Sequence, residues 1–123
     1  MKVLINKCYG GYGFSDEFIK HLIKNDIIKN FMGQHYLSRH NQELIKEAVA
    51  FGLDKAGSMC SELTVKDVPD GANYSIHEYD GMECIDNIWI EVSVHDLKYG
   101  LKQHQLHMIK QGCDIKPIKL DEL

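Results

Sequence analysis

The first 24 residues constrain the fold most, because they predict a strand, a glycine-rich loop and a helix in direct succession. The run Val3–Ile5 is continuously apolar, which is typical of a strand that is buried on both faces. The segment Cys8–Phe14 contains three glycines in four positions and does not suit regular structure. Ser15 is a suitable N-cap for a helix over residues 16–24, which begins with two acidic residues. We therefore expect the N-terminal strand to be central in a sheet.

Periodicity and turn signals place the remaining elements. Apolar residues at helical spacing predict a second helix that is capped by Ser38 or Asn41 and runs to about Phe51. The dipeptide Asp80-Gly81, between two alternating stretches, is a strong signal for a two-residue β-hairpin turn. We expect residues 26–40 to be irregular, with at most one short edge strand. A strand should follow over residues 63–66 and a turn over residues 69–71. The chain should end with a helix over residues 93–111 and an extended tail over residues 115–120.

These elements predict one α+β domain over residues 1–123, a length that suits a single hydrophobic core. Its sheet would be mostly antiparallel, with the N-terminal strand in the centre and two to three helices covering it. Residues 93–123 would form a C-terminal helix and the extended tail. The proline of that tail confines the segment to a sheet edge or to the outside of the fold.

Charge and hydropathy exclude some classes of partner. The chain has 18 acidic and 14 basic residues, a formal charge of −4, which does not suit a protein that wraps duplex nucleic acid. No apolar run approaches the roughly 20 residues of a membrane helix, and the N-terminal residues lack the apolar region of a signal peptide. We expect a cytoplasmic protein whose four cysteines are free thiols, with no duplex nucleic acid and no membrane among its partners.

The glycine-rich loop is the strongest functional signal. Backbone N–H groups of such a loop, ahead of a helix N-terminus, can approach an anion and typically a phosphate. A lysine and tyrosines are available for charge pairing and base stacking, and a lone arginine ahead of the second helix could clamp a phosphate. The candidate ligand-binding residues are Lys7, Cys8, Tyr9, Gly10, Gly11, Tyr12, Ser15, Arg39 and Tyr79. The pattern matches neither a P-loop nor a dinucleotide fingerprint, so glycines that merely allow a tight crossover stay an alternative.

Catalytic and metal sites have weaker signals. Cys8 lies near a predicted helix N-terminus, which could activate a thiol if a histidine approached it. The carboxylates of Glu78, Asp80 and Glu83 surround the predicted hairpin turn, where acidic residues also serve solubility. His104 and His107 share a predicted helix face, but two ligands do not make a metal site. We expect no catalytic residue, no metal and no cofactor.

The sequence INKCYGGYGFS with its acidic helix start, the later VPD turn and the run HEYDG resemble a group of small, uncharacterised phage and viral proteins. Their hallmark is an N-terminal INKCxGGF-like strand, loop and short helix. The resemblance is specific over residues 4–18 and looser over residues 60–83. The segment Tyr12–Phe14 departs from the phenylalanine and leucine typical of that loop, and residues 93–123 look like an addition.

The resemblance implies a viral accessory protein in the host cytoplasm. Together with the glycine-rich loop, it leads to the hypothesis of a non-catalytic sponge that sequesters a nucleotide-derived signal of host immunity. We expect a homo-oligomer, because a domain of this size has little interior in which to enclose a ligand. The alternatives are a module that docks on a host protein through Tyr9, Tyr12 and Phe14, and a small hydrolase that uses Cys8 or paired carboxylates.

Overall fold

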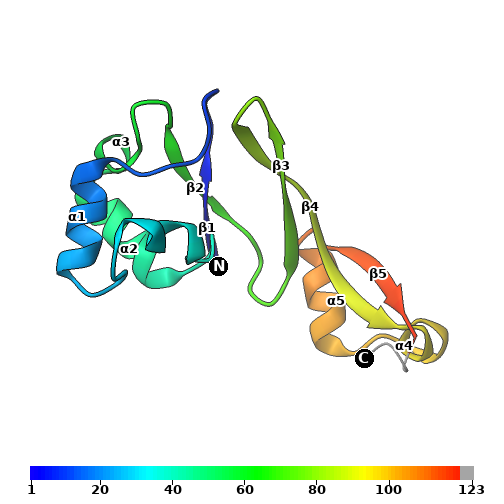
Figure 1. Cartoon of the computed structure of the whole chain (residues 1–123). Helices are drawn as coiled ribbons and strands as arrows, with labels where there is room; N and C mark the ends of the chain where they lie inside the picture. The colour runs from blue at the N-terminus through cyan, green and yellow to red at the C-terminus, as the bar shows by residue number, and fades with distance from the viewer. Residues whose placement is uncertain (120–123) are drawn as a thin grey trace. The chain divides into compact units, whose positions relative to one another are not determined.

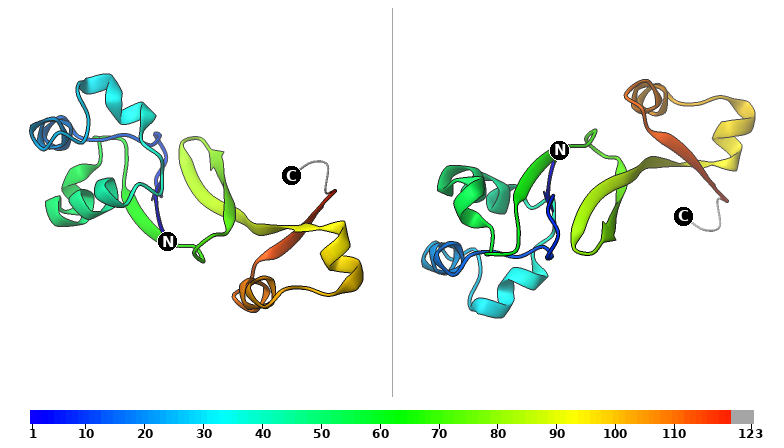
Figure 2. Two further views of the ribbon diagram at one scale, coloured as in Figure 1. Left: turned by 90° about the horizontal axis from the view of Figure 1, so that it is seen from below. Right: turned by 90° about the horizontal axis from the view of Figure 1, so that it is seen from above.

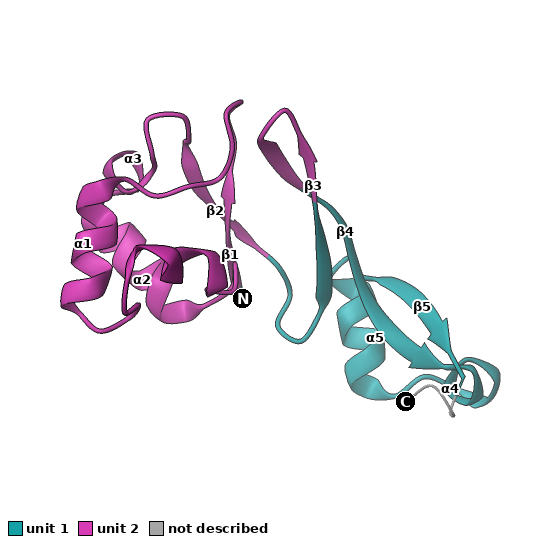
Figure 3. Ribbon diagram, in the orientation of Figure 1, with its two compact units in different colours: residues 1, 68–76, 85–123 teal, residues 2–67, 77–84 magenta. Residues whose placement is uncertain are grey.

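The protein, described here by a computed structural model over residues 1–119, has an α+β fold with two small sheets (Figures 1 and 2). The α+β class agrees with the prediction, but the described residues form two sheets instead of one mostly antiparallel sheet, and six helices instead of two to three. The chain divides into two compact units (Figure 3). Unit 1 comprises residues 1, 68–76 and the chain from 85 on, and unit 2 comprises residues 2–67 and 77–84. The end of the predicted tail, residues 120–123, lies outside the described residues.

Unit 2 contains a two-stranded sheet, helices and the turn of a hairpin. Its two longest helices begin where side chains accept the first free N–H groups. The Oγ atom of Ser15 accepts a bond from the backbone of Phe18 at 3.2 Å, and the Oδ1 atom of Asn41 accepts one from Leu44 at 3.0 Å. Both caps agree with the sequence analysis. The elements are β1 (Lys2–Asn6), α1 (Asp16–Lys24), the 3₁₀ helix η1 (Phe31–Tyr36), α2 (Gln42–Phe51), α3 (Leu53–Ala56) and β2 (Leu63–Asp67).

The core of unit 2 lies between the helices and one face of the sheet. Phe18 is fully buried, and its ring centroid lies 5.2 Å from those of Phe14 and Phe51. Leu4 contributes to this cluster from β1, and Leu63 contributes from β2. The apolar face of α1 therefore binds the start of the chain to the helices that follow it.

The N-terminal strand is not the central strand of a sheet, so that prediction was wrong. Among the described residues, β1 pairs only with β2, in antiparallel register from Lys2 opposite Asp67 to Asn6 opposite Leu63. Other groups satisfy its second edge. The backbone N–H of Leu4 donates to the carbonyl of Arg39 at 2.8 Å, and that of Asn6 donates to Oε1 of Glu83 at 2.9 Å. An apolar strand can therefore be buried here without a second neighbouring strand.

The segment over residues 26–40 also differs from the prediction, because it forms η1 and no edge strand. The side chain of Asn30 accepts a bond from the backbone of Gly33 at 3.2 Å, which starts the 3₁₀ turn. A Cβ atom on Gly33 would lie 2.8 Å from that of Ile28, so the turn packs closely on the preceding residues.

The hairpin turn at Asp80-Gly81 is confirmed. It joins β3 (Asn73–Tyr79) to β4 (Met82–Ser93), and its two residues have φ values of +50° and +87°. Positive φ at both central positions is the geometry that favours such a dipeptide. The turn end of the hairpin, residues 77–84, belongs to unit 2.

Unit 1 continues β4 into two helices, α4 (Val94–Tyr99) and α5 (Gln103–Lys110), and then into β5 (Asp114–Ile118). The single helix expected over residues 93–111 is wrong, because Gly100 takes a φ of +130° and ends α4. β5 pairs in parallel with β4, so the sheet of order β3-β4-β5 is mixed. Its place at the sheet edge agrees with the position expected from Pro117.

Candidate functional site

The glycine-rich loop packs against the hairpin turn of its own unit. The backbone N–H of Gly10 donates to the carbonyl of Asp80 at 3.0 Å. A Cβ atom on Gly81 would overlap the backbone nitrogen of Gly11 and lie 2.7 Å from that of Gly10. A Cβ atom on Gly10 would lie 2.8 Å from that of Cys60. Glycines at these two positions therefore permit a close approach of the chain to itself.

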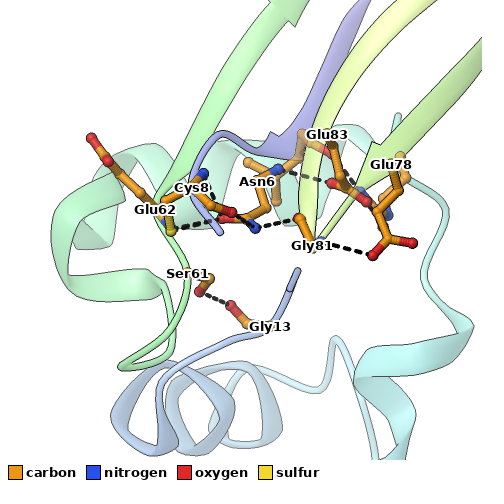
Figure 4. Close-up of polar contacts among 10 residues, drawn as sticks. Asn6, Cys8, Gly13, Ser61, Glu62, Glu78, Gly81 and Glu83 are labelled. Carbon is orange, nitrogen blue, oxygen red and sulfur yellow. Dashed lines mark hydrogen bonds and ion pairs between the residues drawn. The ribbon is translucent and has the colours of Figure 1, made fainter. Parts of the chain in front are cut away.

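A buried asparagine ties these segments together (Figure 4). Asn6 has no exposed surface, and its Nδ2 atom donates to the carbonyls of Cys8 and Gly81, each at 2.7 Å. Its Oδ1 atom accepts bonds from the backbone of Glu62 at 2.8 Å and of Cys8 at 3.4 Å. The amide thus joins the end of β1, the loop, the approach to β2 and the hairpin turn. The sequence analysis missed Asn6, although a polar residue that directly ends an apolar strand was a usable signal.

Arg39 lies against the loop, as the sequence hypothesis required, but its guanidinium is already paired. Its Nη1 and Nη2 atoms bind the two carboxylate oxygens of Glu83 at 2.7 and 2.8 Å. The side chain of Glu83 is only 7% exposed, and the Arg39 guanidinium carbon lies 3.4 Å from the centroid of the Tyr12 ring. Burial raises the pKa of the Tyr12 phenol well above its usual value. The fork that a phosphate would occupy holds a carboxylate instead.

The remaining predicted site residues divide by exposure. Tyr9 and Tyr79 are 62% and 64% exposed, whereas Tyr12 is half-buried with its ring edge against Phe14. Lys7 forms an exposed ion pair with Glu62 at 3.3 Å. Gly11 has open space at the position that a Cβ atom would take, while Ser15 serves as the cap of α1.

The thiol and the carboxylates that were considered for catalysis also have hydrogen-bond partners in the structure. Within residues 1–119, the Cys8 thiol lies 3.5 Å from Oδ1 of Asn6 and 3.3 Å from the carbonyl of Cys60. Oε1 of Glu78 accepts a bond from the backbone of Gly81 at 2.9 Å, as Figure 4 shows. Two of the three carboxylates considered for acid–base chemistry therefore support the turn and the edge of β1.

A recess of about 130 Å³ lies beside Arg39. Its walls are Tyr12, Gly13, Gln34, His35, Leu37 and Arg39, all of unit 2. Small-molecule sites usually have volumes of about 300–1,000 Å³, so this recess is small for a nucleotide.

The described part of the chain holds neither a candidate metal site nor a candidate membrane span. No group of three or more His, Cys, Asp or Glu side chains there is placed to hold a metal ion. None of the helices within residues 1–119 has the length and apolar character needed to span a membrane.

Comparison of the chain with models of protein families, with curated proteins and with solved structures finds no match. The geometry and charge of the site therefore carry the functional argument.

Proposed function

We propose that the protein acts as a binding module that docks on another protein through a surface beside the glycine-rich loop. We name this surface the loop–turn patch and define it as the exposed side chains of Tyr9, Met59 and Tyr79. The observation that carries the proposal is that three separate segments each carry a large exposed side chain one residue away from a contact that joins those segments.

The patch residues are chain neighbours of the contacts that hold the loop. Tyr9 precedes Gly10 and Tyr79 precedes Asp80, which are joined by the 3.0 Å backbone bond. Met59 is fully exposed and precedes Cys60, whose Cβ a side chain on Gly10 would contact. Tyrosine and methionine are enriched at protein interfaces, and a rigid tyrosine ring supplies contact area at a low entropic cost.

Charge favours a protein partner over a nucleotide. The exposed acidic residues Glu62, Glu78 and Asp80 come from the same segments as the patch, and Lys7 is already paired with Glu62. The guanidinium of Arg39 is held by Glu83. An acidic rim repels phosphate, whereas it complements a protein surface that has basic residues around an apolar centre.

Substitution of the two tyrosines tests the proposal. Protein carrying Tyr9→Ser and Tyr79→Ser is used beside the wild type to capture partners from an extract of the cells that produce it. The affinity of a captured protein is then measured by calorimetry. We expect a loss of about 30-fold or more, because an interface tyrosine that carries binding contributes about 2 kcal/mol. Added salt should weaken the binding of the wild type, because salt screens the attraction between the acidic rim and basic residues of the partner.

The matched control is Tyr36→Ser, because Tyr36 is 84% exposed in the same unit but lies on η1. Equal losses of affinity in the control and the double variant would contradict the proposal.

A second experiment measures the melting temperature of the protein with NAD, ADP-ribose and cyclic nucleotides. A ligand at 100 times its Kd adds about 2.7 kcal/mol of stability. Stabilisation that Lys7→Ala removes would favour the sequestration of a nucleotide-derived molecule instead. A light-scattering mass measured on the same sample tests the expected homo-oligomer.

A further inference from the structure

Two cysteines of unit 2 lie side by side where the pairing of β1 with β2 ends. Beyond the last residue pair of the two strands, the N–H of Lys7 donates to the carbonyl of Glu62 at 2.9 Å. Cys8 follows Lys7 directly, and Cys60 lies two positions before Glu62. The Sγ atom of Cys8 is 3.3 Å from the carbonyl oxygen of Cys60, although 52 positions separate the two cysteines in the sequence. The fold therefore brings together two thiols that have no local relation in the sequence.

The absence of a side chain on Gly10 allows this approach. A Cβ atom there would overlap the carbonyl oxygen of Cys60 and lie 2.8 Å from its Cβ atom. Covalent geometry keeps a carbonyl oxygen within about 3.5 Å of the Cβ atom of its own residue, so the Cys8 sulfur lies within about 7 Å of the Cys60 Cβ atom. A disulfide places the two Cβ atoms about 3.5–4.5 Å apart. Rotation of the Cys60 side chain and a shift of a few ångströms in its turn would bring the two sulfur atoms into bonding distance.

Exposure distinguishes this pair from the other two cysteines. The Cys60 side chain is exposed and lies in a turn, and Cys8 is partly buried. Cys113 is buried in unit 1, where an oxidant in solution does not reach it readily. Cys84 is exposed on β4, but no hydrogen bond joins it to another cysteine within residues 1–119. Cys8 and Cys60 therefore combine access to an oxidant with contact between the two residues.

We propose that Cys8 and Cys60 form a redox-sensitive pair that hydrogen peroxide converts into a reversible disulfide. The Cys60 sulfur attacks one oxygen of the peroxide, an S–O bond forms as the O–O bond breaks, and the second oxygen leaves as water with the thiol proton. The Cys8 sulfur then attacks the sulfur of this sulfenic acid. An S–S bond forms as the S–O bond breaks, and the leaving hydroxide takes the Cys8 proton as a second water. The two thiols lose two electrons and two protons, and thiol–disulfide exchange with a small thiol such as glutathione restores them.

The disulfide forms beside the loop–turn patch. Tyr9 follows Cys8, and Met59 precedes Cys60. Disulfides of proteins in a reducing compartment are usually transient and often sense the redox state. Formation of the bond does not depend on the proposed docking function, because it occurs in the isolated protein.

The test treats the full-length protein at micromolar concentration with hydrogen peroxide, alkylates the remaining thiols and identifies linked peptides by mass spectrometry. The lysines of the chain place each of the four cysteines in a different tryptic peptide, so every possible pair has its own mass. We expect the peptide that links Cys8 to Cys60 within one chain to predominate, and dithiothreitol to remove it. In concentrated urea the preference should change to Cys60 and Cys84, the pair closest in sequence, because loop closure costs least entropy there.

Cys84→Ser is the matched control, because it removes an exposed thiol from the same unit and should leave the yield of the Cys8–Cys60 peptide unchanged. Cys8→Ser should abolish that peptide and leave a sulfenic acid on Cys60, which dimedone traps. Cys60→Ser, at an exposed position, gives a second variant that lacks the bond, and circular dichroism shows whether each variant is folded. A folded protein without the Cys8–Cys60 peptide, the same mixture of pairs in folded and unfolded protein, or links formed mainly between chains would each overturn the proposal.

Discussion

Substitution of Gly81 by alanine tests whether the glycines allow the chain to pack closely on itself or leave room for a ligand. Gly81 sits in the hairpin turn with a φ of +87°, and the α-hydrogen that a Cβ atom would replace faces the backbone of Gly10 and Gly11. A methyl group there would overlap Gly11 and lie 2.7 Å from the nitrogen of Gly10. Backbone atoms cannot rotate away as a side chain does, so the loop and the turn must move apart.

The expected cost has two parts. A positive φ costs an L-residue about 1–2 kcal/mol. Separation of the loop from the turn also removes the bond from Gly10 to Asp80 and the bond from Asn6 to Gly81, each worth about 0.5–1.5 kcal/mol net. Gly81→Ala should therefore lower the free energy of unfolding by about 2–5 kcal/mol, a large share of the 5–15 kcal/mol typical of a domain.

Gly11→Ala is the matched control. Gly11 has a φ of +104° in the same loop, but nothing lies within 4 Å of the position that its Cβ would take. It should show the conformational cost of about 1–2 kcal/mol alone. Urea denaturation followed by circular dichroism gives both free energies, and exchange of the Gly10 amide reports the local opening. Equal destabilisation of the two variants, with an unchanged Gly10 amide, would refute the close packing of loop and turn.

Two further predictions concern the groups beside the loop. Arg39→Ala leaves the 7% exposed carboxylate of Glu83 without its counterion and should cost about 3–5 kcal/mol in urea denaturation. Arg39→Lys should recover only part of this because it lacks the planar fork, and full recovery would contradict the bidentate geometry. Burial raises the pKa of Tyr12 above its ordinary value of 10.0, so the unfolded chain loses this proton before the folded protein does. The free energy of unfolding should therefore fall as the pH rises above about 10, and Tyr12→Phe should reduce that slope in urea midpoints measured between about pH 8 and 11.

Local features of the fold could be predicted because their causes lie within a few residues. Ser15 and Asn41 cap helices through bonds to residues three positions away. The turn at Asp80-Gly81 follows from the ease with which these two residues adopt positive φ. No tertiary contact is needed to recognise any of these signals.

The position of β1 could not be predicted, because its second edge is satisfied from distant parts of the chain. The backbone of Arg39 accepts one bond and the side chain of Glu83 accepts another, the latter from a residue 77 positions earlier. Apolar character indicates that Val3–Ile5 is buried but does not show what pairs with its edges. Likewise, the sequence indicated that α5 is helical, but not that Gly100 would separate it from α4.

The candidate site, too, could be predicted only in part. Arg39 does lie at the glycine-rich loop, where the sequence hypothesis placed it. Its partner Glu83 was interpreted only as one of several carboxylates around a turn, because acidic residues are common at turns for reasons of solubility. The bidentate pair depends on the hairpin bringing Glu83 to the edge of β1, and this contact has no local signature.

A glycine cluster alone does not distinguish a ligand cradle from a tight self-contact, since both need backbone without a Cβ atom. The contacts of Asn6 favour the self-contact. Its buried amide uses its Nδ2 donors on Cys8 and Gly81 and accepts bonds at Oδ1 from Glu62 and Cys8. A ligand that took the place of the turn would break the bond to Gly81 and leave a buried donor unpaired, at a cost of about 1–3 kcal/mol. A partner that engages Tyr9 and Tyr79 meets side chains that are already exposed and leaves every one of these bonds intact.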